Sequence, residues 1–143
     1  MFNLPIKSVM DKKKILTASP DTTVSQASEL MAARNVGAIM VVEHLHLVGI
    51  FTERDAVFRV IARGLEPRTT RLAEVMTAEP LTVGPDKPFG FALLMMHENG
   101  FRHVPVIENG KPVGIVSSRN ALDPDLEEFV SEAQRRKYIQ ELR

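Results

Sequence analysis

The sequence predicts an α+β fold built from two copies of one unit, followed by an amphipathic helix. Three observations predict it: an internal repeat, helix and strand patterns that recur in each copy, and a globular length and composition. The chain has 143 residues, 44% of them hydrophobic, and its 18 basic and 18 acidic residues give a formal net charge of zero. This composition excludes a disordered chain, and it argues against a dedicated duplex-binding domain, which would carry a basic excess.

The repeat emerges when the chain is aligned with itself at an offset of 65 residues. Identical residues then coincide without a gap: Leu16-Thr17 with Leu81-Thr82, Pro20-Asp21 with Pro85-Asp86, Val48-Gly49-Ile50 with Val113-Gly114-Ile115, and Arg54 with Arg119. A unit of about 60 residues buries only about 60% of its unfolded surface when alone. We therefore expect the copies, residues 1–64 and 72–122 with a polar linker at 65–71, to share a buried face.

Each copy is predicted to form a strand, a helix, two strands and a second helix, in that order. The first strand is the short stretch around Leu16-Thr17. A helix should follow it, because Thr23 and Gln26 have the spacing of a capping box. In the second copy Pro88 suits the first helical turn and Gly100 suits the helix end.

A strand hairpin should follow this helix in each copy. The apolar runs at residues 39–42 and 47–52 are typical of paired strands, and residues 104–107 and 112–117 repeat them. Asn109-Gly110 separates the second pair and is the strongest short hairpin signal. The sequence therefore predicts one hairpin in the middle of each unit.

Helices are predicted to close the first copy and the chain. The first copy ends in a helix that starts near Asp55 and stops at Gly64. After Leu122, Asp123-Pro124 is typical of a helix start. Apolar residues then recur on one side, at Leu126, Phe129, Val130 and Ala133. We expect an amphipathic helix within residues 123–143 that packs on the body or on a second subunit.

The motif that most favours a binding function is Gly49-Ile50-Phe51-Thr52-Glu53-Arg54-Asp55, where a strand ends and a helix begins. Backbone N–H groups at a helix start, beside the Thr52 hydroxyl, suit an anion such as phosphate. The Asp55 carboxylate can accept hydrogen bonds from a ribose diol. In the second copy Ser117 keeps the hydroxyl, and Asn120 replaces the carboxylate. Simple helix capping by the same residues is the alternative interpretation.

Both repeats resemble a tandem pair of CBS domains, often called a Bateman module. The resemblance covers roughly residues 5 to 122 and is carried by Val9-Met10 and Val75-Met76, Pro20-Asp21 and Pro85-Asp86, Arg102-His103-Val104-Pro105-Val106, and the two strand-to-helix motifs. It implies two units packed through their sheets about a pseudo-twofold axis. It also implies a homodimer of four units, and clefts that commonly bind AMP, ADP, ATP, S-adenosylmethionine or NAD.

The resemblance further implies which residues would bind such a ligand. The first site would consist of Thr17, Val36, Gly37, Ala38, Thr52, Arg54 and Asp55. The second would consist of Thr82, Phe101, Arg102, His103, Pro105, Ser117, Arg119 and Asn120. Arg102, His103 or Arg119 could meet phosphates, or could form ordinary surface pairs. Because Asn120 is uncharged, its hydrogen bonds to a ribose would lack charge assistance.

The function implied is a regulatory module that binds an adenine nucleotide and transmits a conformational change to an unidentified partner protein. The C-terminal helix would be its output element. The alternative is a protein-interaction and dimerisation scaffold whose clefts stay empty. Nucleic-acid binding through Lys12-Lys13-Lys14 and through Arg68 with Arg71 is disfavoured by the zero net charge.

Three absences complete the expectations from the sequence. No residue pattern pairs a nucleophile or base with a positioned partner, so we expect no enzyme and no cofactor beyond the regulatory ligand. His44 and His46 lack a nearby third ligand, so we expect no metal site. The chain has no cysteine, no secretory signal pattern and no apolar run of membrane-spanning length, which together favour a cytoplasmic protein without membrane contact.

Overall fold

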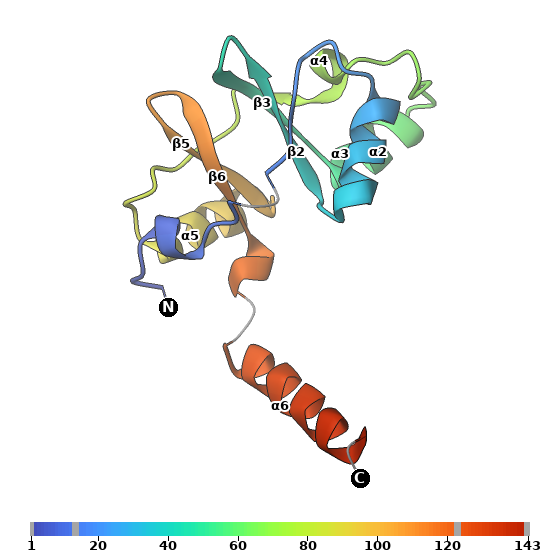
Figure 1. Cartoon of the computed structure of the whole chain (residues 1–143). Coiled ribbons are helices and arrows are strands. Elements are labelled where there is room, and N and C mark those ends of the chain that lie inside the picture. The colour runs from blue at the N-terminus through green and yellow to red at the C-terminus, as the bar shows by residue number, and fades with distance from the viewer. Residues whose placement is uncertain (1, 13–14, 122–123, 142–143) are drawn as a thin grey trace.

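The computed structural model describes residues 2–12, 15–121 and 124–141, but no side chains over 124–131. The element order is α1 (Ile6–Val9), β1 (Thr17–Ala18), α2 (Val24–Arg34), β2 (Ala38–Glu43), β3 (His46–Thr52), α3 (Glu53–Asp55), the π-helix η1 (Ala56–Ile61), α4 (Leu72–Val75), β4 (Thr77–Ala78), α5 (Phe89–Asn99), β5 (His103–Glu108), β6 (Lys111–Ser117), the 3-10 helix η2 (Ser118–Ala121) and α6 (Pro124–Glu141). The α+β class is confirmed (Figure 1).

The first unit is a four-stranded sheet with helices packed on it, in the strand order β1-β2-β3-β4. β1 runs parallel to β2, while β3 is antiparallel to both β2 and β4. Val24 and Met31 of α2 share a buried core with Phe51 of β3 and Val60 of η1. The Thr23 hydroxyl accepts from the Gln26 amide at 3.2 Å, which confirms the predicted cap of α2.

The second unit repeats this plan with shorter edges. β5 and β6 form an antiparallel hairpin, and Asn109 and Gly110 in its turn both have positive φ, as a tight hairpin turn requires. Single bridges replace the outer strands: Val83 pairs in parallel with β5, and Asp11 pairs with Ile115 of β6. The helix predicted to close this unit is only the single 3-10 turn η2, which corrects the predicted symmetry of the two copies.

The two units exchange the segments that precede them. Ile6 of α1 lies in the core of the second unit, beside Phe89 and Val104. Leu72 and Val75 of α4, at the equivalent point of the repeat, lie in the core of the first unit. The predicted boundaries at residues 64 and 72 therefore follow the sequence repeat but do not divide the hydrophobic core. Exchange arises because each segment leads into one unit while burying its apolar side in the other.

Two glycines allow the exchanged segments to lie flat against the sheets. The Met76 thioether contacts the place that a Gly49 side chain would occupy, and Met10 contacts Gly114 in the same way. Because β3 and β6 also lie against one another, the units pack through their sheets. The repeated contacts are the expected result of a pseudo-twofold relation between the copies.

The C-terminal helix α6 spans 18 residues and projects away from the two units (Figure 1). Residues 132–141 are exposed, so this part of the helix does not pack on the body, and packing on a second subunit stays a prediction. The predicted stripe at Leu126, Phe129 and Val130 lies outside the described side chains.

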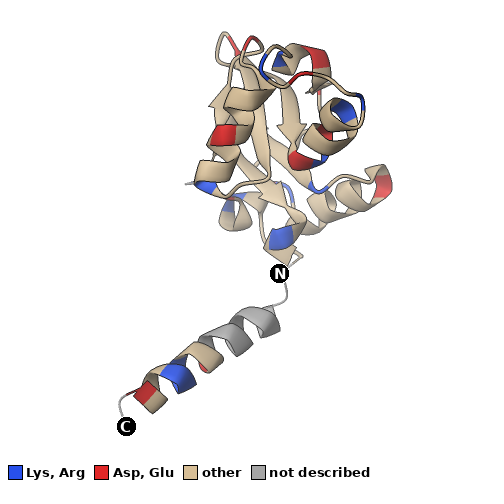
Figure 2. Ribbon diagram, turned by 90° about the vertical axis from the view of Figure 1, so that its right-hand side faces the viewer, with Lys and Arg blue, Asp and Glu red and all other residues tan. Residues whose placement is uncertain are grey.

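Charges of both signs are interspersed over the ribbon in Figure 2, without a face of one sign in that view. Of the predicted basic run, Lys13 and Lys14 lie outside the described residues. Within the described ranges, no helix is long and apolar enough to cross a membrane.

Candidate functional site

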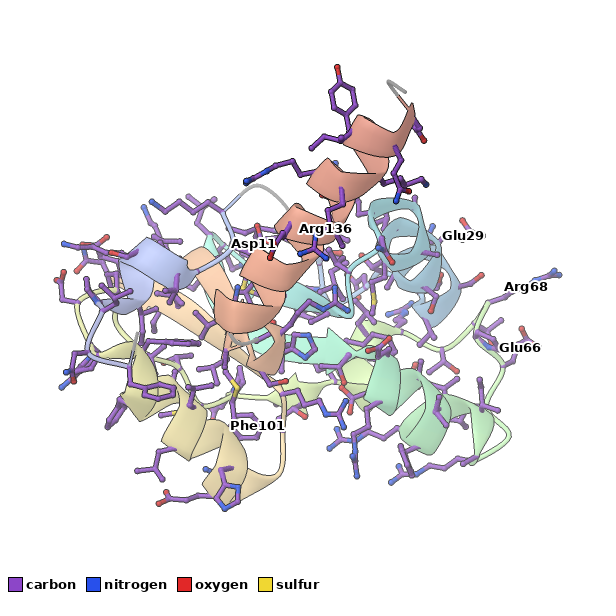
Figure 3. The ribbon with its side chains drawn as sticks, turned by 90° about the horizontal axis from the view of Figure 1, so that it is seen from below. Asp11, Glu29, Glu66, Arg68, Phe101 and Arg136 are labelled. Carbon is purple, nitrogen blue, oxygen red and sulfur yellow. The ribbon has the colours of Figure 1, made fainter. Side chains whose placement is uncertain are left out.

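Two cavities lie between the units, and each is lined by residues of both. The larger has a volume of about 720 Å³ and combines Thr52 and Asp55 of the first unit with Phe101 of the second. The smaller, of about 290 Å³, combines Val36 of the first unit with Asn120 of the second. Figure 3 shows Phe101 just after α5, on the side of that helix turned toward the first unit.

This arrangement exchanges halves of the two predicted sites. Thr52, Arg54 and Asp55 line the larger cavity together with Phe101, Arg102 and His103, which the sequence analysis assigned to the other site. Val36, Gly37 and Ala38 line the smaller cavity together with Arg102, His103, Ser117, Arg119 and Asn120. The predicted grouping is therefore corrected. Its physical cause is the sheet-to-sheet packing. This packing turns the strand-to-helix motif of each unit toward the residues just before the hairpin of the other unit, which are 101–103 and 36–38.

Three predicted residues line neither cavity. Thr17 is exposed on β1, and Pro105 is buried inside β5. Thr82 is partly buried, while its neighbour Leu81 lines the larger cavity. Leu81 and Thr82 lie in the irregular segment between β4 and α5, and only the first of them faces the cavity. A resemblance to the family motif alone does not decide which of two neighbours faces the cavity.

The strand-to-helix motif of the first unit is rigidly hydrogen-bonded. Asp55 Oδ2 accepts from the Thr52 amide at 2.9 Å and from the Thr52 hydroxyl at 3.1 Å. The Asp55 amide donates to the same hydroxyl oxygen at 3.3 Å, which completes a capping box. The capping interpretation is therefore confirmed, and the same two residues line the cavity. A carboxylate has about four acceptor positions, so Asp55 keeps capacity for ligand hydroxyls.

The second motif repeats this geometry without a charge. Asn120 Oδ1 accepts from the Ser117 amide at 2.8 Å and lies 3.4 Å from the Ser117 hydroxyl oxygen. An amide oxygen therefore replaces the carboxylate oxygen in the cap with little change of geometry. The two cavities differ in charge at this position rather than in local backbone structure.

Glu53, Arg102 and His103 line both cavities and so form a shared wall, named here the dividing wall. At Gly37, a side chain would begin 2.9 Å from Glu53 Oε1 and 3.4 Å from His103 Cε1, so the wall packs directly on glycine backbone. The sequence analysis missed Glu53, although it lies inside the quoted motif. No local pattern in the sequence marks it, because its position depends on a residue 16 positions earlier: the Glu53 amide donates to the Gly37 carbonyl at 3.0 Å.

Burial lowers the pKa of His103 below its usual 6.5, and Arg119 and Arg102 add to this effect against the opposing Glu53 carboxylate. The imidazole is therefore neutral near pH 7. Arg102, which is exposed, supplies the positive charge of the dividing wall at that pH. A phosphate in either cavity would meet this guanidinium rather than an imidazolium.

Other polar clusters have less to offer as sites. Within the described ranges, no group of three or more His, Asp or Glu side chains is arranged to hold a metal ion. His46 Nδ1 lies 2.9 Å from the His44 carbonyl oxygen, in a turn where His44 and Leu45 have positive φ. These histidines thus take part in the turn between β2 and β3.

Comparison with known proteins agrees with this architecture. The family model described as CBS domain matches residues 6–62 and 72–125. The chain belongs to the CBS-domain family. A curated relative, CBS domain-containing protein CBSCBSPB2 of Arabidopsis thaliana, is 40% identical over 110 residues, which cover 76% of this chain and 20% of that protein. This chain thus spans about a fifth of that relative.

Shorter relatives and solved structures match more evenly. CBS domain-containing protein YhcV of Bacillus subtilis is 36% identical over 104 residues, covering 73% of this chain and 74% of the relative. A crystal structure of an uncharacterized conserved protein from Pyrococcus horikoshii superposes with a TM-score of 0.79 at 35% identity, covering 85% of this chain and 92% of that one. The tandem CBS pair recognised in the sequence is therefore confirmed.

Proposed function

We propose that the chain is a regulatory module that binds an adenosine-containing ligand in the larger cavity. The observation that carries the proposal is the ionisable Asp55, capped by Thr52 and lining a cavity of about 720 Å³ between the two units. This volume is in the range of small-molecule sites, roughly 300–1,000 Å³. The ligand acts as a regulatory signal rather than as a cofactor.

Each part of such a ligand has a complementary group in the cavity. The ribose hydroxyls donate to Asp55, whose side chain is 13% exposed and so keeps access to the cavity. Phe58 and Phe101 supply apolar wall for the base, and Arg102 supplies a positive charge for a phosphate or carboxylate. The smaller cavity has Asn120 in place of the carboxylate, so we expect it to bind the same ligands more weakly.

A solved relative supports this ligand class. The CBS domain pair of protein MJ0100 was crystallised in complex with 5′-methylthioadenosine and S-adenosyl-L-methionine. It superposes on this chain with a TM-score of 0.72 at 27% identity and covers 82% of it. Both of its ligands carry an adenosine with two ribose hydroxyls, the group that Asp55 is proposed to bind.

The test is a titration of the chain with AMP, 5′-methylthioadenosine and S-adenosylmethionine, with Asp55→Asn as the informative variant. Asparagine preserves the cap, because Asn120 makes the same contact in the second unit. We expect affinity to fall roughly 10- to 150-fold, since hydrogen bonds to charged groups contribute about 1.5–3 kcal/mol. The matched control is Asp86→Asn, because Asp86 lies on the surface with an 82% exposed side chain.

Either outcome of the titration is informative. Adenosine compounds at 100 times their dissociation constant should raise the free energy of unfolding by about 2.7 kcal/mol, which thermal unfolding detects. Such a gain would support the sensor. Binding that is equally strong in Asp55→Asn would refute the ribose role. No binding by any of the three compounds would favour the second candidate function, a protein-interaction scaffold.

Exposed apolar side chains favour that scaffold role and a homodimer. Phe58 and Ile61 of η1 are 58% and 70% exposed, and Phe91 and Leu94 of α5 are 47% and 55% exposed. We propose that a second copy of the chain covers these helices, which would give the expected assembly of four CBS units. Ile61→Lys and Leu94→Lys lie outside both cavities and should shift the mass measured by light scattering from dimer to monomer. An unchanged mass in both variants would refute this interface.

The proposed output is a conformational signal passed to a partner protein. A ligand changes the relative population of two states only by binding one of them more tightly. α6 follows directly after η2 and the smaller cavity, and residues 132–141 stay exposed for a partner. We propose α6 as the element that the partner contacts.

A further inference from the structure

One arginine joins the larger cavity to the segment that crosses between the two units. Arg59 Nε lies 3.5 Å from Asp55 Oδ1 in an ion pair, one helical turn further along the chain. Its Nη1 atom donates to the carbonyl oxygens of Val75 at 3.2 Å and Met76 at 3.1 Å. A single guanidinium therefore contacts both the proposed ribose-binding carboxylate and the end of α4.

The carbonyls that Arg59 contacts are ones that need a donor. The last carbonyls of a helix have no partner within it, and α4 ends at Val75. Here the Arg59 side chain takes that role from 16 and 17 residues away. Removal of the guanidinium would leave these partly buried carbonyls without that donor.

The segment held in this way has consequences for both units. Residues 72–78, named here the crossover segment, comprise α4 and β4. Leu72 is fully buried in the core of the first unit, and Met76 lies on Gly49 of β3. The next residues, Glu79 and Leu81, line the larger cavity and lead into the second unit. A shift of the crossover segment would therefore change the relation between the units.

The position of Arg59 depends on a local irregularity. It lies in η1, where hydrogen bonds close wider turns, such as Ala62 to Val57 at 2.8 Å and Leu65 to Val60 at 3.0 Å. Such π-helical turns are rare and often occur at functional sites. Arg59 is the arginine of this π-helix, and it contacts both Asp55 and the crossover segment.

The second unit provides an internal comparison. At the repeat offset, Asn120 takes the place of Asp55 and Pro124 takes the place of Arg59. The carboxylate is thus replaced by an uncharged amide in the second unit, and the position equivalent to Arg59 falls beyond that unit, on Pro124 of α6. Cap geometry alone does not require the arginine, because Asn120 caps without one. The ion pair of Arg59 with Asp55 is therefore explained by the charge of the carboxylate rather than by helix capping.

We propose that Arg59 is the positioning residue of the larger cavity. It orients the Asp55 carboxylate toward ribose hydroxyls and couples that carboxylate to the crossover segment. A hydroxyl that binds Asp55 shares the carboxylate with the guanidinium, and the guanidinium in turn shares its protons with the carbonyls of Val75 and Met76. The ribose-binding part of this inference rests on the proposed function, whereas the coupling to the crossover segment does not.

The ligand-binding test compares AMP with 2′,3′-dideoxy-AMP by calorimetry. Arg59→Gln is expected to weaken AMP about tenfold or more and to leave the dideoxy nucleotide unchanged, because only AMP presents hydroxyls to Asp55. In an Asp55→Asn background, Arg59→Gln should cost nothing further. Arg63→Gln, an exposed arginine one turn along, removes the same charge as a matched control. An equal loss for both nucleotides, or no loss for AMP, would overturn the positioning role.

A second measurement on the ligand-free chain separates this inference from the proposed function. The Met76 amide donates to the Leu72 carbonyl at 2.8 Å and the Glu79 amide to the Val48 carbonyl at 3.1 Å, so we expect both amides to exchange slowly. Exchange at these amides should accelerate at least severalfold in Arg59→Gln and in Asp55→Asn, and not in Arg63→Gln. Unchanged exchange would overturn the coupling. If the wild-type chain binds neither nucleotide but exchange still accelerates in Arg59→Gln and in Asp55→Asn, the ribose role is removed and the coupling is retained.

Discussion

The exchange of segments between the two units makes a reciprocal prediction about stability. Ile6 and Leu72 occupy equivalent points of the repeat and are both fully buried. Ile6 packs in the core of the second unit and Leu72 in the core of the first. Ile6→Ala should therefore loosen the hairpin of the second unit, residues 103–117. Leu72→Ala should instead loosen the hairpin of the first unit, residues 38–52.

The magnitude follows from burial. Truncation of a fully buried Ile or Leu to Ala costs about 2–5 kcal/mol, because the removed atoms lose their transfer free energy and leave a cavity. For a chain of this length that loss corresponds to a fall in Tm of roughly 5–15 °C. Ile6→Val removes a single methylene group and should cost only about 0.5–1.5 kcal/mol, which makes it a graded control.

Urea unfolding measures the total loss, and hydrogen exchange of the native chain locates it. In Ile6→Ala the amides of β5 and β6 should exchange faster than those of β2 and β3, and Leu72→Ala should show the opposite pattern. The same pattern with smaller amplitude is expected in Ile6→Val. This last variant also keeps the test valid if the alanine substitution prevents folding.

Two results would refute the reasoning. One is a loss in Ile6→Ala below about 0.5 kcal/mol, the usual range for surface substitutions. The other is faster exchange in β2 and β3 rather than in β5 and β6, which would mean that the N-terminal segment packs on its own unit. In that case the predicted boundaries of the units would also be boundaries of the core.

Two further predictions follow from close packing and from burial. Gly49→Ala should destabilise the fold by about 1–3 kcal/mol, because the new methyl group meets Met76, and Met76→Ala in the same chain should recover part of that loss in urea unfolding. Additive losses would contradict the contact. Since the pKa of His103 is lowered in the folded state, the unfolded chain binds more protons, so stability present above pH 6.5 falls as the pH drops below it, by at most about 1.4 kcal/mol per pH unit. His103→Gln should show a smaller fall between pH 7.5 and 5.5, and an equal fall would assign the effect to other groups.

Much of the local structure could be predicted because its causes lie a few residues apart. The Thr23 cap, the Asn109-Gly110 turn and the hydrogen-bonded pair of Thr52 and Asp55 all depend on contacts within three residues. The hairpins follow from apolar runs of strand length. Because of the repeat, most of these helix and strand patterns occur twice, which makes the two-unit plan recognisable from the sequence alone.

The candidate site was only half predictable. Its residue types were recognised from the family motif, and most of them do line a cavity. Their grouping was wrong, because the motif of one unit faces the wall of the other. Glu53 and Arg59 were missed because their roles depend on Gly37 and on the crossover segment, which no local pattern connects to them.

By itself the sequence determined the α+β class, the duplicated unit, the family and the hydroxyl-and-acid motif of each copy. Only the tertiary structure decided which halves of the two motifs meet, which core Ile6 and Leu72 enter, and that residues 132–141 of α6 stay exposed. The physical reason is the range of the interactions. Caps and turns are satisfied by neighbours in the chain, whereas cavities and cores are closed by surfaces that meet only after the two sheets have packed.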